Sequence, residues 1–446
     1  GLGVLGIYNA LQKRMANKTL AAGIVVVICL VLVPGIMAEQ GWDSHNRSGK
    51  YSAADFAKRY LDSCEPNAIL FTNGDNDTFP LWYVQEVENY RTDVRVVNYM
   101  LSSGDWYVSQ MGRKGYDSDR LPLTIDQDFY KKKGSYVPVF ERVDDAELMD
   151  AIKFIKDDNK GTQVPLQNGQ WIDYMPTKNL SYKVDKEAVI ASGTVAEIDS
   201  AEIVDEIDWQ IRQGGLFRND LMLLDLIATN NWERPVYFAN PNSHAKVLGV
   251  DKYCHLEGVV YRFKPTIAKD FINKIGGVNA DRTYEVLMDE NMRWGRLNED
   301  DVILDRESDR NSGMVKQNYV RLAQALLAEK KYDSVGAVLD RGIEFFPHEK
   351  FPFDYYMMSW ADFYYQSGAI DKGNEMVMTI TNRYNEDLQY YASLDDKFSS
   401  EYQSDIQEAI AVMQRLIQVT KQYKQNELAD EIEESLYANI STMNLQ

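Results

Sequence analysis

Histidine and cysteine are scarce in this chain of 446 residues, which has four of the first and three of the second. Four histidines leave little scope for a histidine-rich metal site, and three cysteines are too few for a disulfide scaffold. Cys29 lies inside an apolar segment, so Cys64 and Cys254 are the cysteines that could pair in an oxidising compartment. The sequence leaves this pairing open and favours two separate buried thiols.

No cluster of lysine or arginine is large enough to reverse the acidic charge locally, and 68 acidic against 48 basic residues give a net charge of -20. A surface this acidic repels phosphate backbones, so nucleic acid is not expected as a partner. The sequence also lacks a G-x-S-x-G elbow, a phosphate-binding P-loop and an H-E-x-x-H motif. The chain does have 45% hydrophobic residues, and its length is enough for about three globular domains.

One long apolar run lies near the start of the chain. Residues 19–38 carry no charge, and a helix of this length matches the ~30 Å hydrocarbon core of a bilayer. Lys13, Arg14 and Lys18 precede the run, and Glu39 follows it. Because basic flanks stay in the cytoplasm, we expect a transmembrane helix over about 19–38, with the rest of the chain outside the cytoplasm.

A secretory signal peptide that starts at Met15 and is cleaved after Ala38 is the alternative interpretation of this run. Residues 1–11 are themselves apolar and look like the end of an earlier transmembrane helix, which favours the spanning helix. We therefore expect residues 1–39 to be the end of a membrane body in the inner (cytoplasmic) membrane. The soluble portion is then periplasmic or otherwise extracytoplasmic.

The residues after the apolar run predict an α/β domain. A helix over 51–62 precedes a short buried strand at 68–72, and a helix that reaches Tyr90 precedes a second strand at 94–98. Strand, helix and strand at this spacing predict parallel neighbours joined by a right-handed crossover. A later strand, 235–239, is expected in the same sheet.

A different pattern fills the region between these strands. Segments 171–175, 181–184 and 189–195 are rich in β-formers and separated by turn residues, so each predicts a short strand. An acidic helical stretch, 144–156, precedes them. We expect a β-rich insertion over about 120–215.

The C-terminal part predicts pairs of helices. Residues 316–346 and 354–384 form two such pairs, and Ala323 in the first corresponds to Ala361 in the second at an offset of 38 residues. Helix pairs that repeat every ~34–40 residues are typical of a tetratricopeptide-like solenoid. Residues 400–443 supply a third, less regular pair, as expected for a terminal cap.

The predicted fold class is therefore α/β plus all-α, in three domains. Residues 1–39 are the end of the membrane body with its last transmembrane helix. Residues 40–300 form a Rossmann-like parallel α/β domain with the β-rich insertion. Residues 301–446 form the tetratricopeptide-like helical repeats.

Candidate ligand-binding residues follow the carboxyl ends of the predicted strands, where open α/β sheets bind ligands. They are Asn73, Asp75, Asp77, Asn98 and Asn240. Asp75 and Asp77 are two residues apart, so both carboxylates could hold one divalent cation, the possible cofactor that the sequence suggests. Thr78 is expected to cap the next helix, whose N-terminus instead favours an anion. Such loops also cap helices with no ligand at all, and this alternative stays open.

Aromatic side chains crowd one helix of the second pair. Among them, Tyr356, Trp360 and Tyr364 are candidates for contact with a protein or glycan, because aromatic faces stack on sugar rings and grip peptides. The alternative is that these rings form the core between helices.

Several strings in the sequence have a familiar pattern. The longest is 70–83, LFTNGDNDTFPLWY, and 42–48, 173–178 and 228–239 support it. Together they resemble the extracytoplasmic tail of a bacterial multi-spanning membrane family, formerly of unknown function. That family is similar to GT-C-type glycosyltransferases, and a vertebrate relative is a protein O-mannosyltransferase.

The resemblance implies a membrane body that takes sugar from a polyprenyl-phosphate carrier and places it on a protein serine or threonine. In such enzymes the catalytic carboxylate lies in an outer loop of that body, so no catalytic residue is carried over to this chain. We expect this chain to recognise the acceptor or to act as a scaffold, with membrane lipid, acceptor protein or glycan, and polyprenyl-phosphate sugar as partners. A non-enzymatic cell-envelope interaction module built on the helical repeats is the alternative.

Overall fold

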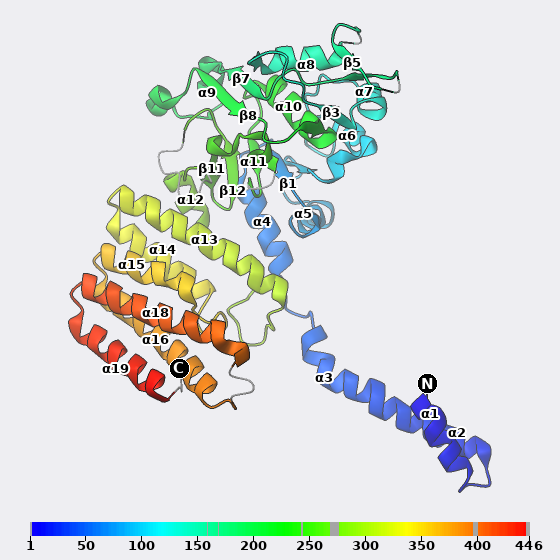
Figure 1. Ribbon diagram of the computed structural model, residues 1–446, viewed down its shortest axis with the longest axis vertical. Helices are drawn as coiled ribbons and strands as arrows, with labels where there is room; N and C mark the ends of the chain where they lie inside the picture. The colour runs from blue at the N-terminus through cyan, green and yellow to red at the C-terminus, as the bar shows by residue number, and fades with distance from the viewer. Residues whose placement is uncertain are drawn as a thin grey trace.

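The computed structural model describes residues 2–157, 159–167, 169–241, 244–267, 276–395 and 400–442. Figure 1 shows a narrow N-terminal arm, an α/β body and a C-terminal layer of paired helices. The predicted division into three domains stays a prediction.

The arm consists of two helical segments that pack against each other, α1 (Leu2–Gln12) and α2 (Lys18–Leu30). A π turn (Val31–Gly35) joins α2 to α3 (Ile36–His45) without a break. Pro34 lies in this turn and has no N–H to donate, and the wider turn lets the helix continue past it. The joined helix Lys18–His45 is long and apolar enough to cross a membrane, and it contains the predicted span.

The α/β body is built on a mixed sheet that has five strands within the described residues, in the order β11-β12-β10-β1-β2. Their bounds are β1 (Ile69–Thr72), β2 (Arg95–Asn98), β10 (Val236–Phe238), β11 (Cys254–Glu257) and β12 (Val260–Phe263). β1 pairs in parallel with β2 and with β10, which confirms the predicted pairing.

The other side of the sheet is antiparallel, because β12 runs against both β10 and β11. Gly258 adopts a φ of 67° in the turn that joins β11 to β12, so the chain folds straight back with no crossover helix. The expected parallel pairing therefore holds for three neighbouring strands and not for the other two, and the Rossmann-like assignment stays a prediction.

Helices cover the sheet on both faces. They are α4 (Ser52–Ser63), α5 (Asp75–Glu88), α6 (Asp105–Met111), α10 (Arg218–Asn230), α11 (His244–Leu248) and α12 (Ala280–Leu287). Side chains of a strand alternate between its faces, so Leu70 enters one core and Phe71 the other. The core of Leu70 continues into the C-terminal helices, and that of Phe71 continues into the insertion.

The insertion mixes helices with short strands. They are α7 (Gln127–Lys132), β3 (Tyr136–Pro138), β4 (Ala146–Glu147), α8 (Leu148–Lys156), β5 (Gln163–Pro165), β6 (Trp171–Asp173), β7 (Asn179–Lys183), α9 (Lys186–Ala191), β8 (Glu206–Gln210) and β9 (Gly215–Phe217). The strand expected at 189–195 is wrong, because α9 occupies its first residues. Asp185 begins α9 by accepting a hydrogen bond from the Ala188 N–H at 3.0 Å.

The C-terminal layer has three helix pairs in the part of the chain that the structure describes (Figure 1). They are α13 (Arg306–Ala328) with α14 (Tyr332–Phe345), α15 (Met358–Gln366) with α16 (Ile370–Ala392), and α18 (Gln403–Gln422) with α19 (Asn426–Thr442). Ala323 and Ala361 are fully buried at equivalent joints. The helix pairs lie where they were predicted, and their assignment to the tetratricopeptide class stays a prediction.

Cys64 and Cys254 are both buried and unpaired, as the sequence favours. Burial raises the pKa of both thiols because an apolar surrounding disfavours the thiolate. Neither is therefore expected to react readily with alkylating reagents in the folded protein.

Candidate functional site

The carboxyl end of β1 lies beside the segment that joins the arm to the body. Lys50, in that segment, forms an ion pair with Asp305 at the start of α13. Asn76, in the first turn of α5, donates a hydrogen bond to Glu307 at 3.2 Å. Asp305 and Glu307 are two residues apart, so the arm and the end of β1 meet at one helix terminus. Figure 1 shows α4 and α5 side by side near this junction.

The loop after β1 is held by its own side chains. Asp77 accepts hydrogen bonds from the backbone N–H groups of Asn73 and Gly74, each at 2.8 Å. The predicted cap at Thr78 is wrong, because α5 begins three residues earlier, after Gly74, and Asp77 in its first turn accepts from the Gly74 N–H. Thr78 is buried instead, with its Oγ1 2.7 Å from the Oγ1 of Thr72.

Asn98 closes the end of β2 in a similar way. Its side-chain Nδ2 donates to Thr78 Oγ1 at 2.9 Å, and its Oδ1 accepts from the Leu101 N–H at 2.8 Å. The Asn98 side chain is almost fully buried. It ties the carboxyl ends of β1 and β2 together and does not face a ligand.

The remaining ligand candidates differ in exposure. Asp75 and Asn240 are exposed, and Asn73 is half-buried. Among the described residues, no group of three or more His, Cys, Asp or Glu side chains is placed to hold a metal ion. Because both oxygens of Asp77 already accept backbone hydrogen bonds, a cation shared with Asp75 would have to compete with the helix cap.

The aromatic candidates separate into a surface residue and two core residues. Tyr356 is 62% exposed, and its ring lies 4.0 Å from that of Tyr355. Trp360 and Tyr364 are only 1% exposed. A Cβ at Gly342 would lie 2.3 Å from the Trp360 ring, and the Tyr364 hydroxyl donates to Asp340 at 2.8 Å. Contact with a partner is therefore wrong for Trp360 and Tyr364 in this fold, because they fill the core between helices.

The sequence analysis missed a group of exposed apolar side chains at the carboxyl edge of the sheet. Phe79, Tyr83, Met100 and Trp106 are between 48% and 59% exposed, and we call them the carboxyl-edge patch. They come from α5, from the end of β2 and from the start of α6. A signal was present in α5, where positions 79, 83 and 87 are apolar at helical spacing, but Leu81 and Val84 predict a second apolar face equally well.

The amino edge of the same strands is closed. Arg234 precedes β10 and donates to the Asn67 carbonyl at 2.9 Å, the Ser118 hydroxyl at 2.9 Å and the Asp119 carbonyl at 3.1 Å. Arg95 at the start of β2 donates to the same loop. Burial, together with the charge of Arg95, lowers the pKa of Arg234 to about 10.

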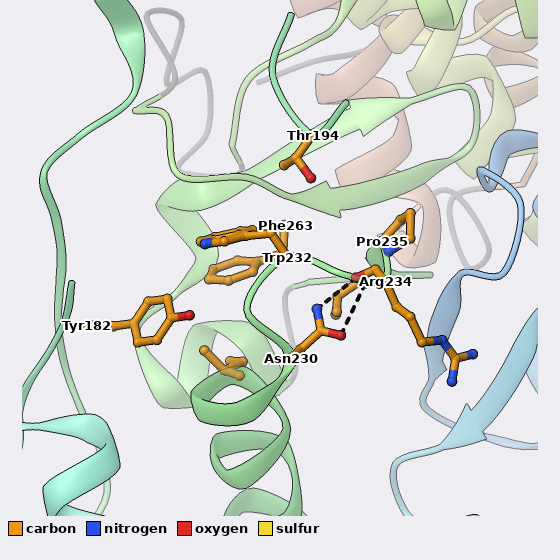
Figure 2. A pocket seen from close by; sticks show the side chains of 9 residues that line it. Tyr182, Thr194, Asn230, Trp232, Arg234, Pro235 and Phe263 are labelled. Atoms are coloured by element: carbon orange, nitrogen blue, oxygen red, sulfur yellow. Dashed lines mark hydrogen bonds between the residues drawn. The ribbon is translucent and has the colours of Figure 1, made fainter. Parts of the chain in front are cut away.

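A small cavity lies beside Arg234. Figure 2 shows Trp232 stacked on Phe263, with Tyr182 next to them and the Arg234 guanidinium pointing away. The two stacked rings are 5.5 Å apart with 16° between their planes. The cavity volume is about 10 Å³, which is about the space of one water molecule. It is too small for a substrate.

These features define a mixed α/β protein with an apolar helix long enough to cross a membrane and a C-terminal layer of helix pairs. The family model described as TMEM260-associated domain 2 matches residues 53–282, more than half of the chain, and the chain belongs to that family. The matched region runs from α4 into α12 and so contains the whole sheet and the insertion. A transmembrane-protein family agrees with the apolar arm. No curated protein and no solved structure matches the chain.

Proposed function

We propose that this chain is the extracytoplasmic C-terminal module of a membrane-bound, GT-C-type glycosyltransferase. The enzyme would transfer sugar from a polyprenyl-phosphate carrier to a serine or threonine of a protein, with this module in the periplasm. The chemistry would take place in a membrane body, and the module would recognise the acceptor or hold it in place.

The observation that carries this proposal is the position of the carboxyl edge. Open α/β sheets use this edge to bind ligands, and here it meets the membrane arm at the start of α13 through Lys50 and Asn76. An acceptor held at this edge would lie close to the membrane, where a lipid-linked donor is available. The membership of the chain in a transmembrane-protein family supports the same arrangement.

Deletion tests this proposal in the protein that carries the membrane body. Removal of residues 46–446 should abolish glycosylation of the acceptor protein and leave binding of the carrier lipid intact. The matched control deletes only α18 and α19, which do not contact the carboxyl edge. Unchanged transfer to protein after the full deletion would refute the module's role.

The second candidate is a non-enzymatic envelope module that binds a partner protein through its helix pairs. The exposed, closely packed pair Tyr355 and Tyr356 favours it, because such rings often anchor protein interfaces. The sequence upstream of the arm separates the two functions. An acidic residue in the first outer loop of a membrane body favours the transferase, and its absence favours the interaction module.

A further inference from the structure

The carboxyl-edge patch is an unusual surface for a protein with a net charge of -20. Single exposed apolar side chains are common, but here Phe79 and Tyr83 lie on α5, which packs on β2, and Met100 and Trp106 lie on the chain that leads from β2 into α6. Asn98 holds the end of β2 against α5 through Thr78, which fixes the spacing between these elements. The patch is therefore part of a rigid edge and needs a partner that accepts aromatic and apolar groups.

The carboxyl-edge patch is held close to the end of the membrane helix. The segment between α3 and α4, residues 46–51, can extend over at most about 20 Å, so the body cannot move far from the end of the membrane helix. Lys50 and Asn76 shorten this distance further, because both side chains bind the start of α13. The edge of the sheet nearest to the arm is the edge that carries the patch.

The residue types of the carboxyl-edge patch fit the surface of a bilayer. Tryptophan and tyrosine concentrate at the headgroup level of a bilayer, where the ring is apolar and its polar atom stays hydrated. Trp42 on α3 is 70% exposed and Tyr51 before α4 is 58% exposed, so aromatic residues line the chain from the membrane helix to the body. The patch continues this series.

We propose that the carboxyl-edge patch rests in the headgroup layer of the membrane that holds the arm. The acidic charge of the protein, with exposed Asp75 and half-buried Asp105 near the patch, fits zwitterionic lipid better than anionic lipid. The contact holds the sheet at a fixed tilt over the bilayer, with its amino edge and the insertion directed away from it.

Lipid cross-linking tests this contact on the full chain in phosphatidylcholine nanodiscs. A diazirine near the glycerol end of the acyl chain labels protein at the headgroup boundary, and mass spectrometry locates the adducts. We expect adducts on peptides from α5 and from residues 100–106, in addition to those on the arm. Adducts confined to residues 2–51 would overturn the proposal and would indicate that the patch docks on protein.

Two variants make the test specific. The double variant Phe79→Ser with Tyr83→Ser should lose the adducts on residues 100–106, because the edge no longer settles into the lipid. The control Ile198→Ser removes an apolar side chain that is 91% exposed in the insertion, and it should leave the adducts unchanged. If the double variant does not fold, the positions of the lipid adducts on the unmodified chain still test whether the carboxyl-edge patch contacts the membrane.

This inference goes beyond the proposed function, since the experiment needs neither donor nor acceptor. Loss of glycosylation with normal lipid adducts would count against the transferase proposal alone. Normal glycosylation without these adducts would count against the lipid contact alone.

Discussion

The two edges of the parallel strands differ in how their polar groups are used. At the amino edge, Arg95 and Arg234 are buried and donate to backbone carbonyl groups of a neighbouring loop. At the carboxyl edge, Asp77 accepts within its own loop and Asn98 donates to Thr78 in the next helix, and exposed side chains lie around them. The amino edge is sealed by long-range bonds, and the carboxyl edge is left accessible.

This difference separates stability from function within one sheet. Buried polar groups that bridge distant segments are costly to remove, because their partners lose hydrogen bonds away from water. Exposed side chains at a strand end contribute little to folding and are free to contact a partner. Substitutions at the amino edge should therefore lower the unfolding free energy most, and substitutions of exposed side chains at the carboxyl edge should change mainly what the protein binds.

The largest loss of stability is expected on substitution of Glu257, a buried carboxylate at the end of β11. Glu257 lies 2.5 Å from Lys264, is 1% exposed and also contacts Arg262. Burial alone would raise the pKa of Glu257, but Lys264 and Arg262 outweigh it and lower the pKa to about 2. Glu257→Gln leaves two buried cations without their carboxylate and should cost about 3–5 kcal/mol of unfolding free energy at pH 7.

The pH dependence of this effect has a definite sign. The folded pKa of Glu257 lies below the unfolded value of about 4.3, so its stabilisation is complete above that value. The difference in unfolding free energy between the original chain and Glu257→Gln should then shrink as the pH falls toward 2. Chemical denaturation in detergent at several pH values measures it, with exposed Glu233→Gln as the control. A difference that grows on acidification would contradict the assignment.

Arg234→Met should give the next largest effect. The substitution keeps an apolar stem but removes donors to three acceptors in two loops, so the unfolding free energy should fall by about 2–3 kcal/mol. Arg120→Met changes an exposed arginine next to the same loop and should be nearly neutral. Equal effects of the two substitutions would mean that the amino edge is not sealed by Arg234.

Asp77→Ala should have a smaller effect at the carboxyl edge. It removes the carboxylate that accepts two backbone hydrogen bonds at the start of α5, which is typically worth about 1 kcal/mol. Thermal unfolding followed by circular dichroism measures the loss. A loss as large as that of Arg234→Met would mean that the two edges contribute equally to stability.

Asp75→Ala should have the smallest effect, within about 0.5 kcal/mol, because the side chain is exposed. Magnesium or calcium should leave the melting temperature of the original chain unchanged, since Asp77 is engaged in the cap. A cation-induced rise in melting temperature that Asp75→Ala abolishes would instead establish the divalent-cation site that the sequence suggested.

The sequence predicted the elements that local patterns determine. Short apolar runs bounded by turns identified β1, β2 and β10, and helical spacing identified the C-terminal pairs. It did not predict the antiparallel strands, in which Glu257 and Arg262 interrupt the apolar pattern although both side chains are buried as ion partners. The start of α5 was misplaced because its N-cap, Gly74, has no side chain to accept a hydrogen bond, whereas Thr78 has the side chain expected of a cap.

The candidate site was harder to predict for a related reason. Residue type placed Asp77 and Asn98 at strand ends correctly, but not the hydrogen bonds that occupy them. Spacing put Tyr356, Trp360 and Tyr364 on one helix without revealing that a glycine on α14 admits the Trp360 ring. The exposure of the carboxyl-edge patch depends on which neighbouring elements cover α5, and that is a property of the whole fold.

The most direct test of the account compares the distances of the two edges from the membrane. A fluorophore is attached to Asp75→Cys at the carboxyl edge or to Lys114→Cys near the amino edge, in the full chain with Cys29→Ser, and lipid headgroups in the nanodisc carry the acceptor dye. If the carboxyl edge faces the membrane, energy transfer from position 75 is much stronger than from position 114. Equal transfer, or stronger transfer from position 114, would contradict it.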